Sequence, residues 1–294
     1  NVSLMTTKKA GTNPEEISNK ASEHLLAPAY KFYANGGYKD ALLVLDNLTN
    51  NYPTDPLLFS IGGDCYIALG EYERAILCYE QALKLSPKSI KLLRKKIEAL
   101  VISGKLDHSL KICNEAILNI NDNSDLYLSR GSIFHKQGKF ESAIESYDEA
   151  IKLNPKNAEA FINKANSLEN ILKFNEAISC AEQAIRIKPD SSLAYFNLGV
   201  SAMQLRLFDL SMESFNKAIE IQPNTPKYEF AKATLFLLFG NFKKGWALWE
   251  SRWKLDKLFS PKLDESNHQL WTGERKAKLL IWAEQGVGDQ IMYS

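Results

Sequence analysis

Residues 138–155 read GKFESAIESYDEAIKLNP, and this stretch decides the fold. It sets a glycine, a large ring and a small residue at fixed offsets, followed by apolar residues spaced like one face of a helix. The closing proline, Pro155, belongs to a series with a 34-residue interval, in which Asn121 fills the one slot without proline; the other members are Pro53, Pro87, Pro189 and Pro223. A fixed period of this length predicts a stack of similar supersecondary units.

Seven units fit this period without insertion or deletion, and they begin at Ser22, Pro56, Ile90, Ser124, Ala158, Ser192 and Pro226. Position 20 of each unit is small, and position 8 is small in every unit except the third, where it is Ile97. Small residues at both positions allow two antiparallel helices to approach closely. Position 17 is large and apolar throughout, and we expect it to fill the space between neighbouring hairpins.

The ends of the expected helices carry matching signals. Position 34 holds Asp, Ser, Asn or Thr, whose side-chain oxygens cap helix N-termini. Position 15 is glycine in five units, as a turn after a helix favours. Leu172 and Arg206 replace that glycine, so we expect differently shaped turns there. Each unit is therefore predicted to form one helix over positions 1–14 and a second over positions 18–31.

These features resemble those of the tetratricopeptide-repeat (TPR) family over Ser22 to about Phe259. The resemblance implies an all-α fold, a right-handed superhelical solenoid of about seven helical hairpins. It also implies that the first helices of the hairpins line a concave groove, which binds a protein or peptide. Positions 2, 5, 6, 9, 12 and 13 of each unit face that groove in the family.

One candidate site in this groove is basic, because the third unit places Lys91, Arg94 and Lys95 at such positions. In one interpretation they form an anion-binding patch for a carboxylate or an acidic peptide. In the other they form an ordinary solvated helix face beside Glu98.

A second candidate site is polar. Asn163 and Asn197 at position 6, with Asn166 at position 9, resemble the asparagine ladder of the repeats in O-linked N-acetylglucosamine transferase. Asparagine amides there imply paired contacts to a peptide backbone. Only two units match, and the alternative is that asparagine is merely tolerated at a half-exposed position.

Apolar side chains follow further along the expected groove; they include Phe196, Met203 and Phe230. An apolar patch of this kind indicates an interaction surface. The alternative is that the C-terminal segment of the chain itself covers the patch.

The seventh unit changes character after Gly245, where Trp246, Trp249 and Trp253 fall on one helix face. We expect this face to pack the end of the array against something large. Stacking of a ligand on it is the less favoured alternative.

Beyond the array, residues 260–277 are expected to form a linker, and residues 278–283 a buried strand that enters a glycine-rich loop. The loop contains Gly286, Gly288 and Asp289. An unpaired strand has two free edges, so we expect residues 278–283 to pair with another copy in a homodimer, to fold back on the array, or to stay loosely ordered.

The C-terminal sequence resembles the junction between the array and a glycosyltransferase-like domain of the two-Rossmann (GT-B) type in bacterial TPR proteins. The matching residues are Gly245, Trp246, Glu250, Arg252, Trp253, Trp271, Gly273, Glu274 and the loop 284–289. The resemblance implies that residues 278–294 are the truncated start of a Rossmann-like domain. Because the second Rossmann domain would be absent, we expect no transferase activity and no catalytic residues in this chain.

The composition of the chain narrows the classes of function that remain. Thirty-six Lys and Arg against 35 Asp and Glu give a net charge of +1, which argues against general nucleic-acid binding. No apolar run approaches the ~18 residues of a membrane span, and the expected tail or short helix at residues 1–21 has no apolar signal core. The four cysteines are widely spaced and do not cluster with the four histidines, so we expect reduced thiols, a cytoplasmic location, no metal and no cofactor.

The leading hypothesis is therefore a non-catalytic scaffold over residues 22–259 that binds a protein or peptide. One alternative is the acceptor-recognition arm of a bacterial TPR-containing glycosyltransferase. A second alternative is a self-assembling scaffold.

Overall fold

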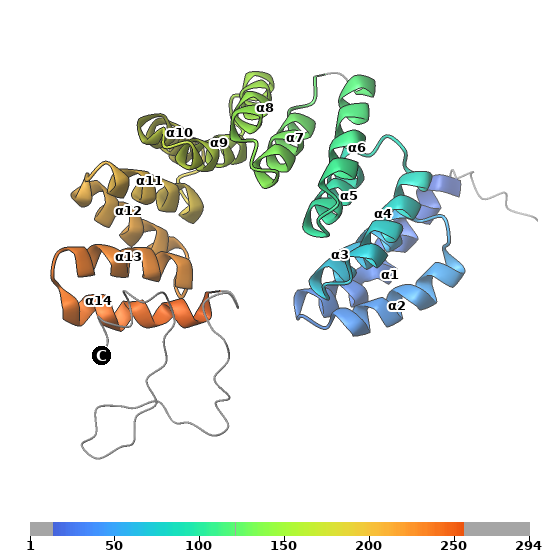
Figure 1. Cartoon of the computed structure of the whole chain (residues 1–294). Helices are drawn as coiled ribbons and strands as arrows, with labels where there is room; N and C mark the ends of the chain where they lie inside the picture. Colours follow the sequence, from blue (N-terminus) through green and yellow to red (C-terminus); the bar gives the residue numbers. More distant parts are fainter. Residues whose placement is uncertain (1–13, 121, 256–294) are drawn as a thin grey trace, which may run out of the picture. The chain divides into compact units, whose positions relative to one another are not determined.

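The computed structural model describes residues 14–120 and 122–255, and this part of the chain is all-α, without a strand. Figure 1 shows the helices in order along the chain. They form two compact units, divided between Pro155 and Lys156. The first unit contains α1 Pro14–Ala34, α2 Tyr38–Asn51, α3 Pro56–Ala68, α4 Tyr72–Leu85, α5 Ile90–Ile102, α6 Leu106–Asn119, α7 Ser124–Lys136 and α8 Phe140–Leu153. The second contains α9 Ala158–Asn170, α10 Phe174–Ile187, α11 Ser192–Gln204, α12 Phe208–Ile221, α13 Pro226–Leu238, α14 Phe242–Trp249 and a 3₁₀-helix, Glu250–Lys254.

The helix starts confirm the 34-residue register from the second hairpin onward. Six first helices begin at the residues that open the predicted units, and each is 13 residues long. The second helices begin one residue earlier than predicted, at position 17. The first hairpin differs more, because α1 begins at Pro14 and includes residues that were assigned to the N-terminal tail or short helix.

The predicted caps are confirmed at five of six sites. The side chains of these residues accept a hydrogen bond from a backbone N–H in the first turn of the next helix; they are Asp55, Ser89, Asn123, Asn157 and Ser191. Thr225 differs, since its hydroxyl donates to the Gln222 carbonyl instead. Pro226 at the first helical position has no backbone N–H, so one donor fewer at the start of α13 needs a capping partner.

The turns at Leu172 and Arg206 do not differ in shape from the glycine turns, contrary to the expectation from sequence. The five glycines have φ between +71° and +81°, while Leu172 and Arg206 have φ of +60° and +59°. The hydrogen bonds match as well: Lys173 N–H donates to the Leu168 carbonyl at 2.9 Å, as Lys139 N–H donates to that of Phe134. These paired bonds close the helix end and hold a side-chain-bearing residue in the left-handed conformation.

Close helix approach within a hairpin depends on position 8 and its partner at position 24. A β-carbon added to Gly131 would overlap the Tyr147 ring, and glycines 63 and 199 face the rings of Tyr79 and Phe215 in the same way. The third hairpin reverses the sizes, with Ile97 at position 8 and Cys113 at position 24 in one buried cluster. The exception in the sequence is therefore an exchange of volume between two facing helices.

Position 20 behaves as predicted, since it is buried in every hairpin. The large residues at position 17 do not reach the expected depth: Phe140 is half-buried against His135, and Phe242 is exposed. The rings that are fully buried belong to position 24, at the middle of the second helix, where both neighbours cover them.

Candidate functional site

The first helices of successive hairpins carry every predicted groove residue, and we call the surface that they present the A-helix face. Within the first compact unit, α3, α5 and α7 contribute to this face; within the second, α9, α11 and α13 do. In the second unit α11 contacts both α9 and α13. Residues on these three helices can therefore act together.

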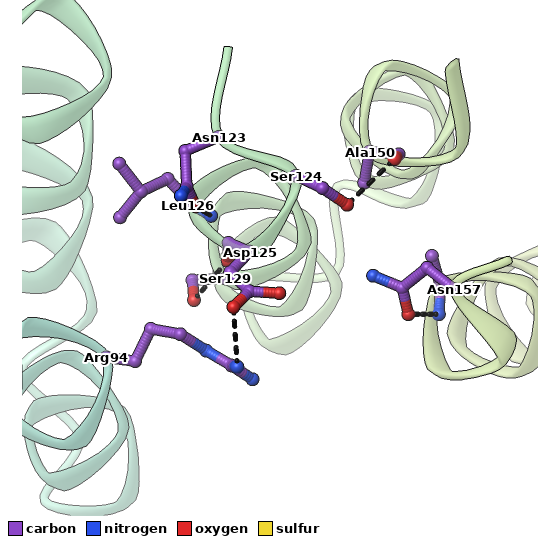
Figure 2. A network of polar contacts seen from close by, with 9 residues as sticks. Arg94, Asn123, Ser124, Asp125, Leu126, Ser129, Ala150 and Asn157 are labelled. Atoms are coloured by element: carbon purple, nitrogen blue, oxygen red, sulfur yellow. Dashed lines mark hydrogen bonds and ion pairs between the residues drawn. The ribbon is translucent and has the colours of Figure 1, made fainter. Parts of the chain in front are cut away.

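The basic candidates in α5 are paired with carboxylates from neighbouring hairpins. Figure 2 shows the Arg94 guanidinium beside the Asp125 carboxylate of α7, at 3.2 Å. Lys95 Nζ lies 2.5 Å from a carboxylate oxygen of Asp64 in α3 and also donates to Ser60 Oγ at 3.0 Å. Only Lys91 of the predicted three is fully exposed.

Asp64 joins three helices. Its second carboxylate oxygen accepts a hydrogen bond from the Tyr79 hydroxyl of α4 at 2.7 Å. Burial and this hydrogen bond raise the pKa of Tyr79 well above its usual value. The Lys95 ammonium is thus already paired with Asp64 within the array, so an acidic ligand would have to displace Asp64 to bind it.

Asp125 is held in the same manner at the start of α7. Its backbone carbonyl accepts from Ser129 Oγ at 2.9 Å, and the preceding residue Ser124 donates to the Ala150 carbonyl of α8 at 2.8 Å (Figure 2). With Asn123 capping the helix, the first turn of α7 is fixed in position to meet Arg94. The predicted basic patch is therefore largely a set of inter-repeat ion pairs.

The three asparagines of the second unit differ in accessibility. Asn166 is exposed and Asn163 is half-buried. Asn197 is only 4% exposed, and its Nδ2 donates to the Ile162 carbonyl of α9 at 3.2 Å. Asn197 thus ties α11 to α9, which corrects its predicted place among the ligand-contacting residues.

The predicted apolar residues also differ in how deeply they are buried. Phe196 is buried, packed on Phe215 and Tyr228, so it belongs to the interior beneath the face and not to its surface. Met203 is half-buried and packs against this cluster. Phe230 is half-buried too, with its ring centroid 4.6 Å from that of Trp249. This contact joins α13 and α14 within the seventh hairpin, and packing of the tryptophan face against something larger stays a prediction.

Sequence reasoning missed Glu169, which lies at position 12 of α9. The hydroxyl of Ser201 in α11 donates to Glu169 Oε1 at 2.7 Å. Burial raises the pKa of Glu169 to about 7, although Ser201 and the ammonium of Lys227 in α13 act in the opposite direction. The carboxylate is therefore held on the A-helix face with only part of its charge compensated.

Lys227 lies on the other side of α11 from Glu169. Its Nζ is 4.3 Å from the centroid of the Phe196 ring, a cation–π contact. Burial of the ammonium lowers the pKa of Lys227, and the charge of Glu169 opposes this shift. The inner surface of α11 is thus flanked by a carboxylate on one side and an ammonium on the other.

A sequence signal for these contacts exists in the repeat register. Three pairs of side chains on neighbouring first helices are separated by 31 or 32 residues, slightly less than one period: Asp64 with Lys95, Arg94 with Asp125, and Glu169 with Ser201. A search for complementary side chains at that separation would have found all three pairs.

Several predicted features fall outside the described residues. They are the linker at 260–277, the strand at 278–283, the loop residues Gly286, Gly288 and Asp289, and any dimer contact made through them. Within residues 14–120 and 122–255, no cluster of three or more metal-binding side chains occurs, and no helix is long and apolar enough to cross a membrane.

Family models match three stretches of the chain. A model described as "TPR repeat" matches residues 121–171, and two described as "Tetratricopeptide repeat" match residues 63–89 and 162–226. A curated relative, protein FlbA of Caulobacter vibrioides, is 38% identical over 73 residues, which are 22% of this chain. The chain spans 11% of the length of FlbA.

Solved structures with a similar fold include a tetratricopeptide repeat protein from Parabacteroides merdae, with a TM-score of 0.61, 16% identity and coverage of 81% of this chain and 94% of that one. PilF of Pseudomonas aeruginosa has a TM-score of 0.56 and 14% identity, covering 66% of this chain and 88% of that one. The APC/C hetero-tetramer Cut9-Hcn1 has a TM-score of 0.61 and 14% identity, covering 75% of this chain and 45% of that one. At these identities the likeness shows the helical-repeat fold alone.

Proposed function

Because the chain contains tetratricopeptide repeats, we propose that it is a binding module that takes a peptide segment of a protein partner on the A-helix face of α9, α11 and α13. In this proposal the described residues catalyse no reaction. The cytoplasmic location expected from the separate thiols stays a prediction.

The observation that carries this proposal is the layered construction of that face. Phe196 and Asn197 form a packed floor, fixed by aromatic contacts and by the hydrogen bond to α9. Polar side chains remain accessible on the same group of helices, with Asn166 exposed and Asn163 half-buried. A rigid floor under accessible donors and acceptors suits a peptide, because little ordering entropy is lost by the protein on binding.

The basic face of α5 is less suited to binding a peptide, and this supports the choice of the face on α9, α11 and α13. There the cations of Arg94 and Lys95 already have carboxylate partners, so a ligand gains only by exchanging one partner for another. Lys91 remains available, but a single exposed lysine contributes little to affinity. Recruitment of acidic peptides by Lys91, Arg94 and Lys95 is therefore the weaker form of the proposal.

Selection of peptides tests the function. A library of displayed 12-residue peptides is selected on the 294-residue chain, and the affinity of enriched peptides is measured by fluorescence anisotropy. Replacing Asn163 and Asn166 together by alanine should weaken binding about tenfold, the loss expected for one or two hydrogen bonds. The matched control replaces Asn175 and Asn216, exposed asparagines of α10 and α12, by alanine. Equal effects of the two double variants would contradict the proposal.

The alternative that the array is the acceptor-recognition arm of a glycosyltransferase rests on the sequence resemblance around residues 245–289. Three of the resembling residues have structural tasks: Gly245 packs directly against Leu237, and Arg252 pairs with Glu250 at 3.1 Å. Reading the gene beyond the codon for Ser294 tests this alternative. A continuing frame that encodes a second Rossmann domain would support it, and a stop codon would contradict it.

Self-assembly through the C-terminal segment is the remaining proposal, and it concerns residues outside the described part. Light scattering over a range of concentrations tests it. A mass that stays that of one chain at all concentrations would exclude it.

A further inference from the structure

Glu169 has unused capacity to accept hydrogen bonds. An ionised carboxylate offers about four acceptor positions. Among the described residues, the Glu169 carboxylate accepts one hydrogen bond, from Ser201, and forms no ion pair. Its side chain is half-buried on α9, so part of it stays accessible to a ligand on the A-helix face.

The nearby cation, Lys227, does not neutralise Glu169 directly. It acts on the carboxylate at long range, and its ammonium already lies over the Phe196 ring. Moving Lys227 onto Glu169 would break that cation–π contact. The carboxylate therefore lacks a close counter-charge, in contrast to Asp64 and Asp125 in the first compact unit.

Holding a carboxylate in this state is costly. Removal from water disfavours its ionised form, which is why the pKa of Glu169 rises to about 7. A structural tie between α9 and α11 would not require this cost, because a neutral glutamine could accept the same hydrogen bond from Ser201. A positive group brought alongside would restore the ionised form and gain a charge-assisted hydrogen bond.

We propose that Glu169 is the anchoring residue for a basic side chain, Lys or Arg, of the peptide bound on the α9, α11 and α13 face. This inference rests on the proposed function and names the chemistry of its partner. Charge complementarity selects a basic group over an acidic one, since an acidic side chain would meet the Glu169 carboxylate. Lys227 offers an acid little in return, because its ammonium is already engaged with the Phe196 ring.

The test uses the enriched 12-residue peptides with two matched variants. Glu169→Gln keeps the size of the side chain and its acceptor for Ser201 but removes the charge. Glu182→Gln removes an exposed charge from α10 and serves as the control. We expect enriched peptides to contain Lys or Arg, Glu169→Gln to weaken their binding by about tenfold to a hundredfold, and Glu182→Gln to leave it unchanged.

A change in the peptide, combined with Glu169→Gln, provides a second arm of the test. The critical Arg is replaced by citrulline, which keeps the shape and loses the charge, or the critical Lys by norleucine. If Glu169 binds this group, the two losses overlap, and the neutral peptide binds Glu169→Gln and the natural chain equally well. If the peptide change and Glu169→Gln each weaken binding and their fold-losses in affinity multiply, the proposal is overturned.

The outcomes separate this inference from the function on which it rests. Peptides that lack basic residues, or that ignore Glu169→Gln, yet lose affinity when Asn163 and Asn166 are replaced, would overturn the role of Glu169 and leave the binding function standing. If no enriched peptide depends on Glu169, Asn163 or Asn166, both proposals are wrong.

Discussion

At the scale of single residues, the structure separates side chains that support the array from side chains that remain available. Asp64 and Asp125 are used by the neighbouring hairpins, whereas Glu169 is held with one hydrogen bond and a raised pKa. The identity of an amino acid does not distinguish these cases. The distinction comes from what the next first helix places opposite each carboxylate.

Glu169 should titrate near pH 7. Because its pKa in the folded protein lies above the ordinary value of 4.5, the folded state binds the proton more tightly than the unfolded state. The contribution to stability is therefore fully present below pH 4.5 and is lost as the pH rises to about 7, by about 3 kcal/mol at most.

Carbon-13 NMR of the glutamate carboxyl groups measures this pKa directly. The signal that disappears in Glu169→Gln should have its midpoint near pH 7, and Ser201→Ala should raise the midpoint further by removing a donor to the ionised form. A midpoint near 4.5 would contradict the burial that we describe.

Leu172→Gly should stabilise the protein. Leu172 is 72% exposed and has φ of +60°, a conformation that costs a residue with a side chain about 1–2 kcal/mol. Glycine also makes the unfolded chain more flexible, which lowers the free energy of unfolding by about 0.4–1 kcal/mol. The net result should be an increase in the free energy of unfolding of about 0.5–1 kcal/mol. Urea unfolding measures it, with Glu182→Gly, at an exposed interior site of α10, as the control that should destabilise by about 1 kcal/mol. A loss of stability in Leu172→Gly would show that its turn is not left-handed.

Lys95 and Lys91 should respond differently to loss of charge. Lys95→Met removes the partner of Asp64, whose side chain is 27% exposed, and should cost about 1–2 kcal/mol of stability. Lys91→Met, at an exposed site of the same helix, should change stability by less than about 0.5 kcal/mol. Equal effects in thermal unfolding would mean that the Lys95 pair has no structural role.

At the scale of elements, the repeat register predicted the hairpins well because it depends on local signals. Caps, glycine turns and small residues act within a few residues of each other, so their positions can be read along the chain. The Leu172 and Arg206 turns were misjudged because hydrogen bonds in the turn, and not the residue type, impose the left-handed conformation.

The start of α1 at Pro14 and the partners of Glu169 were missed for another reason. Residues 14–21 lie outside the 34-residue register that begins at Ser22, so the register carries no signal for this start. The environment of Glu169 is assembled from α11 and α13, and position 12 alone carries no sign of it. The burial of Asn197 and Phe196 was missed likewise, because it depends on the close approach of α9, α12 and α13 to α11.

Exchange of volume between positions 8 and 24 should be transferable between hairpins. Gly131→Ile places a side chain where the Tyr147 ring lies and should cost at least about 1–3 kcal/mol. Adding Tyr147→Cys reproduces the Ile97 and Cys113 pair of the third hairpin and should recover part of that loss. A double-mutant cycle by urea unfolding checks this. If the two single losses simply add, the positions are not packing partners.

At the scale of the whole molecule, two compact units carry the same hairpin design but use their A-helix faces differently. The first unit pairs its charges internally, and the second leaves Glu169, Asn163 and Asn166 for other contacts. A repeat protein can divide its faces in this way because each hairpin is stabilised mainly by its neighbours.

Hydrogen–deuterium exchange with and without an enriched peptide tests the central claim most directly, since it locates the bound peptide on the chain without any substitution. We predict slower exchange in α9, α11 and α13, with α10 and α12 unchanged. Protection confined to α5, or to α10 and α12, would contradict the claim that the second unit binds peptides on its A-helix face.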